Sequence, residues 1–445
     1  MYFREGIAQA DRGRSGDVER PATRFHDRQI RDAGALRVAI LSYRSEPKVG
    51  GQGVYVDYLS RALAESGMKV DVISGPPYPD LTGDVRLVKL PSLDLYAKPH
   101  NGHFALRPWH LLSPTDTYEY FGHLSGKFVE PITYGKRVYA YLKRHLGDYD
   151  VVLDNQTLVS DILKLKTQLN LPLVTTIHHP ITRDRQLAVE AATGWRQRWL
   201  VRRWYSFLKV QSKVAPQLEF VTCPSEHAKK DIVAEFGLDA DRIQPIPLGV
   251  DQTAFRPRID VKRAPMRLIS TASADTPLKG LPFLLEAYHQ LLPTFPQLEL
   301  VVIGKLRDGQ AKRTIKRLGL SDRVVFKSGL SREALAEEFA AATIAVTPSL
   351  YEGFGLPAAE AMSCGTPVIV TDGGALPEVA GDAGIVVPKG DAMALASAIS
   401  DLLANPDRRA AVADACLTRA QETFNWRNIA PRYVDLFQQA MAQTC

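Results

Sequence analysis

Short apolar runs alternate with helical patterns along most of the chain. In the first half, buried-type strands are predicted at residues 36–41, 69–74, 150–154, 172–177, 218–222 and 243–247, with helices at about 54–66 and 128–145. The alternation restarts later, with strands predicted at 266–271, 298–303, 324–326, 344–346, 368–370 and 384–387 and helices at 331–340, 391–403 and 407–422. This order predicts an α/β protein with parallel sheets.

The length and the punctuation of the chain predict two domains. A chain of 445 residues is too long for one ordinary core. Pro245, Pro247, Gly249 and Pro257 mark a linker, so we expect an N-terminal domain over 35–247 and a second domain over 248–424, followed by a last helix over about 425–443. Residues 1–34 are rich in Arg, Asp and Gly and predict a disordered basic tail.

One segment, residues 349–367, is predicted to form the functional centre. It follows one apolar run and precedes another, which predicts a strand, a glycine loop, a short helix and a strand. Gly353 and Gly355 let backbone amides approach a ligand, and the helix N-terminus favours phosphate or sugar oxygens. Glu352 and Glu360 can both face that site. Neither has an obvious local cation, so we expect their partners to be ligand hydroxyls rather than Lys or Arg.

Glu352, residues 353–357 and Glu360 resemble the E-x7-E signature of family 4 retaining glycosyltransferases. The resemblance spans about residues 36–443 and implies the GT-B fold, two Rossmann-like parallel-sheet domains facing a central cleft, with the last helix crossing back onto the first domain. It also implies retaining transfer of a sugar from a UDP- or GDP-linked donor to an acceptor hydroxyl. The nucleotide sugar is then a co-substrate, and neither a cofactor nor a metal is expected.

The resemblance carries donor-side roles onto the second domain. Lys279 matches the phosphate-binding lysine of the family, and Glu352 would orient the donor sugar together with the segment Phe354, Gly355 and Leu356. Glu360 would accept hydrogen bonds from the ribose, and Ser328 lies where the family reads the base. The family has an arginine five residues before the lysine, whereas this chain has Ala274. We therefore expect Lys305 or Arg307 to supply the second charge, or backbone amides to hold the diphosphate.

Two further segments of the first domain join this predicted site. Gly51 and Gly53, in the loop after the first strand, are expected near the donor phosphates, with Tyr43, Arg44 and Gln52 on the acceptor side. A flexible turn is the alternative for that loop. His178, just past a strand end, matches a family histidine that contacts the donor sugar, so that Glu352, Lys279 and His178 form the predicted catalytic set. His179 competes with His178 for that role and is placed on the acceptor side, and a packing role for the histidine stays open.

The stretch 76–126 contains a single predicted strand, at 85–90, and is expected to form a lid on the acceptor side. Its histidines, His100, His103, His110 and His123, lack the spacing of metal ligands and predict surface positions.

Residues 195–213 predict a helix dense in tryptophan and arginine. Such a helix suits an anionic membrane surface, while a buried helix with solvated arginines on its rim is an equal alternative. We therefore expect a membrane lipid or lipid-linked glycan as acceptor, and we expect no nucleic acid, because no nucleic-acid-binding motif accompanies the formal charge of +6.

Four dispersed cysteines fit a reducing cytoplasm, and no apolar run is long enough to span a bilayer. The expected location is cytoplasmic, peripheral on the inner face of the cell membrane, and the oligomeric state is left open.

Two other functions use the same pattern. A nucleotide-sugar epimerase or hydrolase could have the same two-domain architecture, and a catalytically inactive lipid-binding relative is favoured by Ala274 alone. The intact Glu352 and Glu360 pair favours the transferase.

Overall fold

The computed structural model describes residues 35–46, 51–96, 106–192, 194–272 and 277–444. The predicted tail 1–34, Ala274, His100 and His103 lie outside the described residues. Among the described residues, no helix combines the length and the apolar character that crossing a bilayer would need.

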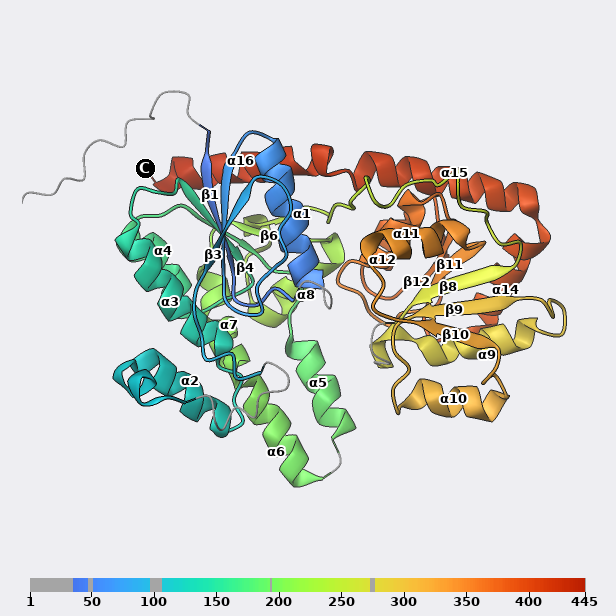
Figure 1. Cartoon of the computed structure of the whole chain (residues 1–445), viewed down its shortest axis with the longest axis horizontal. Helices are drawn as coiled ribbons and strands as arrows, with labels where there is room; N and C mark the ends of the chain where they lie inside the picture. The colour runs from blue at the N-terminus through green and yellow to red at the C-terminus, as the bar shows by residue number, and fades with distance from the viewer. Residues whose placement is uncertain (1–34, 47–50, 97–105, 193, 273–276, 445) are drawn as a thin grey trace, which may run out of the picture. The chain divides into compact units, whose positions relative to one another are not determined.

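The first sheet has seven strands, all parallel, in the order β3-β2-β1-β4-β5-β6-β7 (Figure 1). Its strands are β1 (Arg37–Ser42), β2 (Lys69–Ser74), β3 (Val85–Lys89), β4 (Val151–Asn155), β5 (Leu173–Thr176), β6 (Val221–Cys223) and β7 (Ile243–Pro245). Side chains alternate across β1: Ala39 and Leu41 join one core, Val38 and Ile40 the other. This sheet is therefore buried on both faces, as its near-continuous apolar runs predict.

Helices from distant parts of the chain cover the two faces of this sheet. One face packs against α3 (Glu130–Arg144), α4 (Ser160–Leu169) and α8 (Glu226–Phe236), and the other against α1 (Gly51–Glu65) and α16 (Trp426–Thr444). Tyr433 of α16 and Thr176 of β5 each lie 3.0 Å from the Tyr55 hydroxyl, so the last helix of the chain is bonded to the first sheet.

The second sheet has six parallel strands in the order β10-β9-β8-β11-β12-β13. They are β8 (Arg267–Thr271), β9 (Glu299–Ile303), β10 (Val324–Lys327), β11 (Ile344–Thr347), β12 (Val368–Thr371) and β13 (Ile385–Val387). One face is covered by α9 (Leu281–Leu291), α10 (Gln310–Leu318) and α14 (Ala392–Ala404), and the other by α11 (Arg332–Ala341), α12 (Leu356–Ser363), α13 (Leu376–Ala380) and α15 (Pro406–Thr423). The prediction of two Rossmann-like parallel-sheet domains is confirmed.

Three predictions of local structure were wrong: those for the loop before α1, for the stretch 76–126 and for the helix 195–213. Helix α1 begins at Gly51, so Gly51, Gln52 and Gly53 form its first turn instead of the preceding loop. Glycine is needed at 53 because a Cβ there would overlap the carbonyl oxygen of Glu46. The stretch 76–126 also holds a 3-10 turn (Pro108–Leu112) and α2 (Pro114–Leu124), which starts with the Ser113 side chain accepting a hydrogen bond from Asp116 N.

The predicted helix 195–213 is interrupted. It consists of α6 (Trp195–Trp204), a 3-10 turn (Tyr205–Phe207) and α7 (Leu208–Val214). The turn separates two environments: Phe207, Leu208 and Val214 are buried, whereas none of the ten residues of α6 is. The alternative of a buried helix therefore holds for the second part and is wrong for the first.

Candidate active site

The segment between β11 and β12 forms the predicted strand, glycine loop and helix. Gly355 caps helix α12 with φ of 106°, a backbone conformation that favours glycine, and a Cβ there would crowd the Leu376 side chain. Leu356 opens the helix and Pro357 lies in its first turn, where the missing N–H costs no intrahelical bond. The side chain of Phe354 packs edge-on to Phe424 in the hydrophobic core, and its predicted place at the donor stays a prediction.

Lys279 and Glu352 form an ion pair. The lysine Nζ donates to Glu352 Oε1 at 2.6 Å, and the Ser349 hydroxyl lies 2.8 Å from the same oxygen. The expectation that Glu352 has no lysine or arginine partner was wrong, because 73 residues separate the two side chains and local sequence cannot show their contact. Both bonds end on Oε1, so Oε2 is the oxygen with capacity left for a further hydrogen-bond donor.

Two glycine positions bring Lys279 and Glu352 together. Gly280 has φ of 63°, and a Cβ there would overlap the carbonyl oxygen of Pro348, so the lysine turn lies directly against the start of the signature loop. The Leu350 amide donates to the Leu278 carbonyl at 2.7 Å. On the other side, Ala375 N donates to the Glu352 carbonyl at 2.9 Å, and Gly374 leaves no room for a side chain beside that carbonyl. Sequence reasoning missed the Gly373-Gly374 pair, and the available signal was two adjacent glycines shortly after the buried strand β12.

Glu360 lies in α12 and is 7% exposed. Burial raises the pKa of its carboxyl to about 8, and the charge of Arg332 opposes that rise. Arg332, just inside α11, pairs with Asp57 of α1 at 2.6 Å and lies over the ring of Tyr58 at 4.6 Å. Glu360, the residue predicted to bind the ribose, is therefore buried near an ion pair that joins α11 of the second domain to α1 of the first. Sequence reasoning missed this ion pair.

His178 lies just past β5 and faces Asn155 at the end of β4. Its Nε2 is 2.7 Å from Asn155 Oδ1, and the ring of Tyr55 meets it edge-on at 4.7 Å. Burial and the neighbouring His179 lower the pKa of His178 to about 3. With Asn155 Oδ1 as acceptor, Nε2 is the donor and Nδ1 is the acceptor, so the neutral ring offers a ligand hydroxyl an acceptor nitrogen.

The backbone of the two histidines is held by Gln156. Its Oε1 accepts from His178 N, and its Nε2 donates to the His179 carbonyl, both at 2.7 Å. The His179 ring turns toward Asp184 at 3.3 Å. The structure thus distinguishes the two histidines by their environments: the His178 ring bonds to Asn155, and the His179 ring faces Asp184.

The signature loop also contacts the first sheet's helix α8. Ser225, the N-cap of α8, donates from its hydroxyl to the Gly353 carbonyl at 3.0 Å, and the Tyr351 hydroxyl donates to Asp231 at 2.6 Å. The Glu378 carboxylate accepts from the amides of Glu226 and His227, each at 2.7 Å. Loop, helix α13 and helix α8 therefore meet at the predicted site, and a Cβ on Gly353 would touch the His178 carbonyl oxygen at 3.3 Å.

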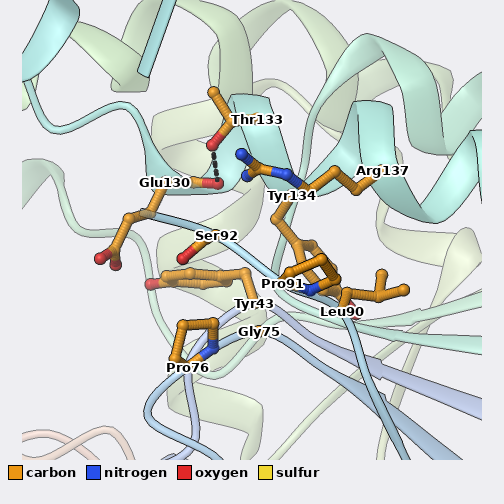
Figure 2. A pocket seen from close by; sticks show the side chains of 10 residues that line it. All are labelled: Tyr43, Gly75, Pro76, Leu90, Pro91, Ser92, Glu130, Thr133, Tyr134 and Arg137. Atoms are coloured by element: carbon orange, nitrogen blue, oxygen red, sulfur yellow. Dashed lines mark hydrogen bonds between the residues drawn. The ribbon is translucent and has the colours of Figure 1, made fainter. Parts of the chain in front are cut away.

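Other predicted residues have surroundings of their own. Figure 2 shows a small pocket beyond β1 and β2, where Tyr43 lies beside Glu130. Arg44 pairs with Glu130 at 3.2 Å, and burial raises the pKa of that carboxyl to about 7. Lys305 and Ser328 are exposed past β9 and β10.

Over the described ranges, no cluster of three or more His, Cys, Asp or Glu side chains is arranged to hold a metal ion. The expectation that the enzyme needs no metal stays a prediction.

Two parallel-sheet domains, with a strand, glycine loop and helix at the carboxyl ends of the second sheet, have the architecture of the GT-B fold. Comparison with known proteins agrees. Residues 49–254 match the family described as Glycosyltransferase Family 4, and residues 257–416 match Glycosyl transferases group 1. The chain belongs to the family 4 glycosyltransferases, as the signature predicts.

Named relatives cover nearly the whole chain. A protein of Mycolicibacterium hassiacum named MMP alpha-(1->4)-mannosyltransferase is 43% identical over 92% of this chain and 99% of its own length. A D-inositol 3-phosphate glycosyltransferase of Xylanimonas cellulosilytica is 30% identical over 91% of this chain and 97% of its own.

Solved structures share the fold. Sucrose-phosphate synthase from Thermosynechococcus elongatus superposes with a TM-score of 0.70 at 24% identity, covering 92% of this chain and 100% of that one. Anabaena HepE in complex with UDP and glucose gives a TM-score of 0.64 at 18% identity, covering 91% and 100%.

Proposed function

We propose that the protein is a retaining α-mannosyltransferase that moves mannose from a UDP- or GDP-linked donor to the 4-hydroxyl of a sugar acceptor, without a metal. The observation that carries the choice of sugar and linkage is the 43% identity to the MMP alpha-(1->4)-mannosyltransferase, which runs over 99% of that relative. A nucleotide-sugar donor is supported by the fold shared with Anabaena HepE, whose structures hold UDP and UDP-glucose.

Lys279 is proposed to stabilise the leaving diphosphate. In a transfer from a nucleotide sugar, negative charge grows on the β-phosphate as the bond to the sugar breaks. An ammonium has three donors, so Lys279 can keep its 2.6 Å bond to Glu352 and still reach a phosphate oxygen. The amides at the start of α12 add the positive end of the helix dipole. Together these groups take the part that a divalent cation plays in other transferases.

Glu352 and His178 are proposed to orient the sugar. Glu352 Oε2 accepts one hydroxyl while Oε1 holds Lys279, which links the position of the sugar to that of the phosphate. His178 stays neutral because of its low pKa, so it binds a second hydroxyl through Nδ1 and does not transfer a proton. A front-face attack lets the departing phosphate take the acceptor's proton, which accounts for retention without a dedicated base.

Glu360 is proposed to bind the nucleotide ribose. Its buried carboxyl is held at a pKa of about 8, so near neutral pH it is mostly protonated and offers both a donor and an acceptor to the two ribose hydroxyls. Gly51 and Gly53 in the first turn of α1 are proposed near the phosphates, with Gln52, Tyr43, Arg44 and His179 on the acceptor side and Lys305 and Ser328 on the base side.

The proposal is tested by incubating the purified protein with UDP- and GDP-linked mannose and glucose and with mannose-containing oligosaccharides, with and without EDTA. We expect a mannosylated product with an α-(1→4) linkage by NMR, at the same rate in EDTA. A β-linked product would refute retention, and a strict need for a divalent cation would refute the metal-independent mechanism. Transfer of glucose in preference to mannose would refute the choice of sugar.

The two alternatives predict other products. An epimerase or hydrolase releases epimerised or free sugar without an acceptor, and an inactive relative turns over no donor. Neither is favoured, since the relatives named above are transferases and Lys279, Glu352 and Glu360 are all present. The expected lipid-linked acceptor and cytoplasmic, membrane-peripheral location remain proposals that the surface described next addresses.

A further inference from the structure

Helix α6 is an exposed helix rich in large apolar side chains. Trp195 and Trp199, one turn apart, are 78% and 54% exposed, and Leu200 and Trp204 are also exposed. Several large apolar side chains exposed together on one helix indicate a binding surface, whereas single exposed ones do not.

A second exposed apolar group comes from α2 and the 3-10 turn before it. Leu112 is 86% exposed, and Trp109, Leu111, Phe121 and Leu124 are exposed as well. The two helices meet near their C-terminal ends: Arg203 Nε donates to the Ser125 carbonyl, and Trp204 stacks on Phe128 with ring centroids 5.2 Å apart. Figure 1 shows α2 and α6 on the same side of the first sheet. We call this combined surface the α2/α6 face.

The charge of the α2/α6 face is positive. Helix α6 contains four arginines and no acidic residue, and none of the four forms an ion pair with any residue that the structure describes. The carboxylates of α2 do not offset them, because Asp116 and the buried Glu119 both pair with Arg137 at 2.5 Å. The Arg203 head is bonded to the Ser125 carbonyl, whereas Arg196, Arg198 and Arg202 are exposed and can pair with an external anion.

We infer that the α2/α6 face docks onto an anionic membrane surface. Tryptophan and leucine enter the boundary between headgroups and acyl chains, and arginines pair with anionic headgroups, at about 1 kcal/mol for each basic residue near the surface. Helix α6 follows α5 (Thr182–Ala191), the first helix of the chain after His178 and His179.

Two other occupants fit the face less well. A sugar chain would stack on the tryptophans but gain nothing from the exposed leucines of α2 and its preceding turn. A symmetric dimer through this face would bring the α6 arginines of one copy close to those of the other, and like charges oppose that contact.

The test is sedimentation of the full chain with vesicles of phosphatidylglycerol and phosphatidylcholine in equal parts, against vesicles of phosphatidylcholine alone. We expect binding to the anionic vesicles only, at least about tenfold weaker in 0.5 M salt, and a blue shift of tryptophan emission on binding. Trp195→Ser/Trp199→Ser and Arg198→Glu/Arg202→Glu should each weaken the partition by about tenfold or more.

A matched control lies on α10, which also carries four basic residues but no tryptophan. Arg313→Glu/Lys316→Glu removes the same charge from that helix and should leave vesicle binding unchanged. Circular dichroism checks that the α6 variants fold, and none of the four α6 residues is placed in the active site.

Equal binding to neutral and anionic vesicles, no binding at all, or an effect of the α10 variant as large as that of the α6 variants would overturn the inference. A spectral shift produced by soluble mannan would assign the face to glycan instead, and a dimer lost in the tryptophan variant would assign it to self-association. Sedimentation requires no turnover, so membrane binding and the proposed mannosyl transfer are tested independently. Either can be refuted while the other is confirmed.

Discussion

The Nζ atom of Lys279 lies 2.6 Å from Glu352 Oε1, although the two residues come from different loops of the second sheet. Both side chains are largely shielded from water. The pair places a cation and a carboxylate at one point, and under the proposed function the first meets a diphosphate and the second a sugar hydroxyl.

Lys279→Ala should lower kcat by about 10² to 10³, because a donor aimed at developing charge is removed. Glu352→Gln should lower it less, since the amide still accepts one hydroxyl. If the two act as a unit, the double variant should lose little more than Lys279→Ala alone, and steady-state kinetics of the three variants measures that coupling. Strictly additive losses would show that the ion pair has no role in catalysis.

Glu360→Ala should raise the donor KM with a smaller effect on kcat, as expected for a residue that binds the ribose in ground and transition states alike. Glu360→Gln should raise it less, because the amide keeps one donor and one acceptor. Unchanged donor KM in Glu360→Ala, measured at saturating acceptor, would remove Glu360 from the donor site.

Glu360 should also make stability depend on pH. Its folded pKa of about 8 is above its ordinary value of 4.5, so its contribution to the free energy of unfolding is fully present below pH 4.5 and is lost as pH rises through about 8. The difference in unfolding free energy between the wild type and Glu360→Gln should therefore shift against the wild type by up to about 1.4 kcal/mol per pH unit inside that window. Urea melts at pH 4.5, 6.5 and 8.5 measure it, and a constant difference would contradict the burial of this carboxyl.

Gly280→Ala should destabilise the protein by more than about 2 kcal/mol, because the new Cβ would meet the Pro348 carbonyl at a residue with φ of 63°. Gly319→Ala is the matched control: φ is 67°, but nothing lies within 4 Å of its Cβ, so only the backbone cost of about 1 kcal/mol applies. Equal urea midpoints for the two variants would show that the lysine turn is not packed against the signature loop.

Glu378→Gln should loosen the contact between α13 and α8. The carboxylate accepts from the amides of Glu226 and His227 at the positive end of the α8 dipole, an arrangement that contributes about 1 kcal/mol. We expect faster hydrogen exchange of those two amides, with little change elsewhere in α8. Asp382→Asn, a nearby change of the same charge, serves as the control.

The sequence by itself determined the α/β class, most strands and the family. Buried parallel strands are short apolar runs that can be recognised from local sequence. Glu352 and Glu360 lie in one short segment, so their spacing is also visible in the sequence. The N-cap Ser225 and the helix opening at Leu356 are local in the same way, because capping depends on neighbours a few residues away.

Only the tertiary structure decided which side chains meet. The Lys279–Glu352 pair, the Arg332–Asp57 pair and the separate environments of His178 and His179 join residues that lie 73 or 275 positions apart or that differ only in which way a ring points. Composition likewise left the arginine-rich segment open between membrane surface and core; the 3-10 turn at Tyr205–Phe207 divided it into an exposed helix and a buried one. Hydrophobic periodicity tells how much of a segment is buried, but the partner of a charge and the direction of a ring depend on contacts made by the folded chain.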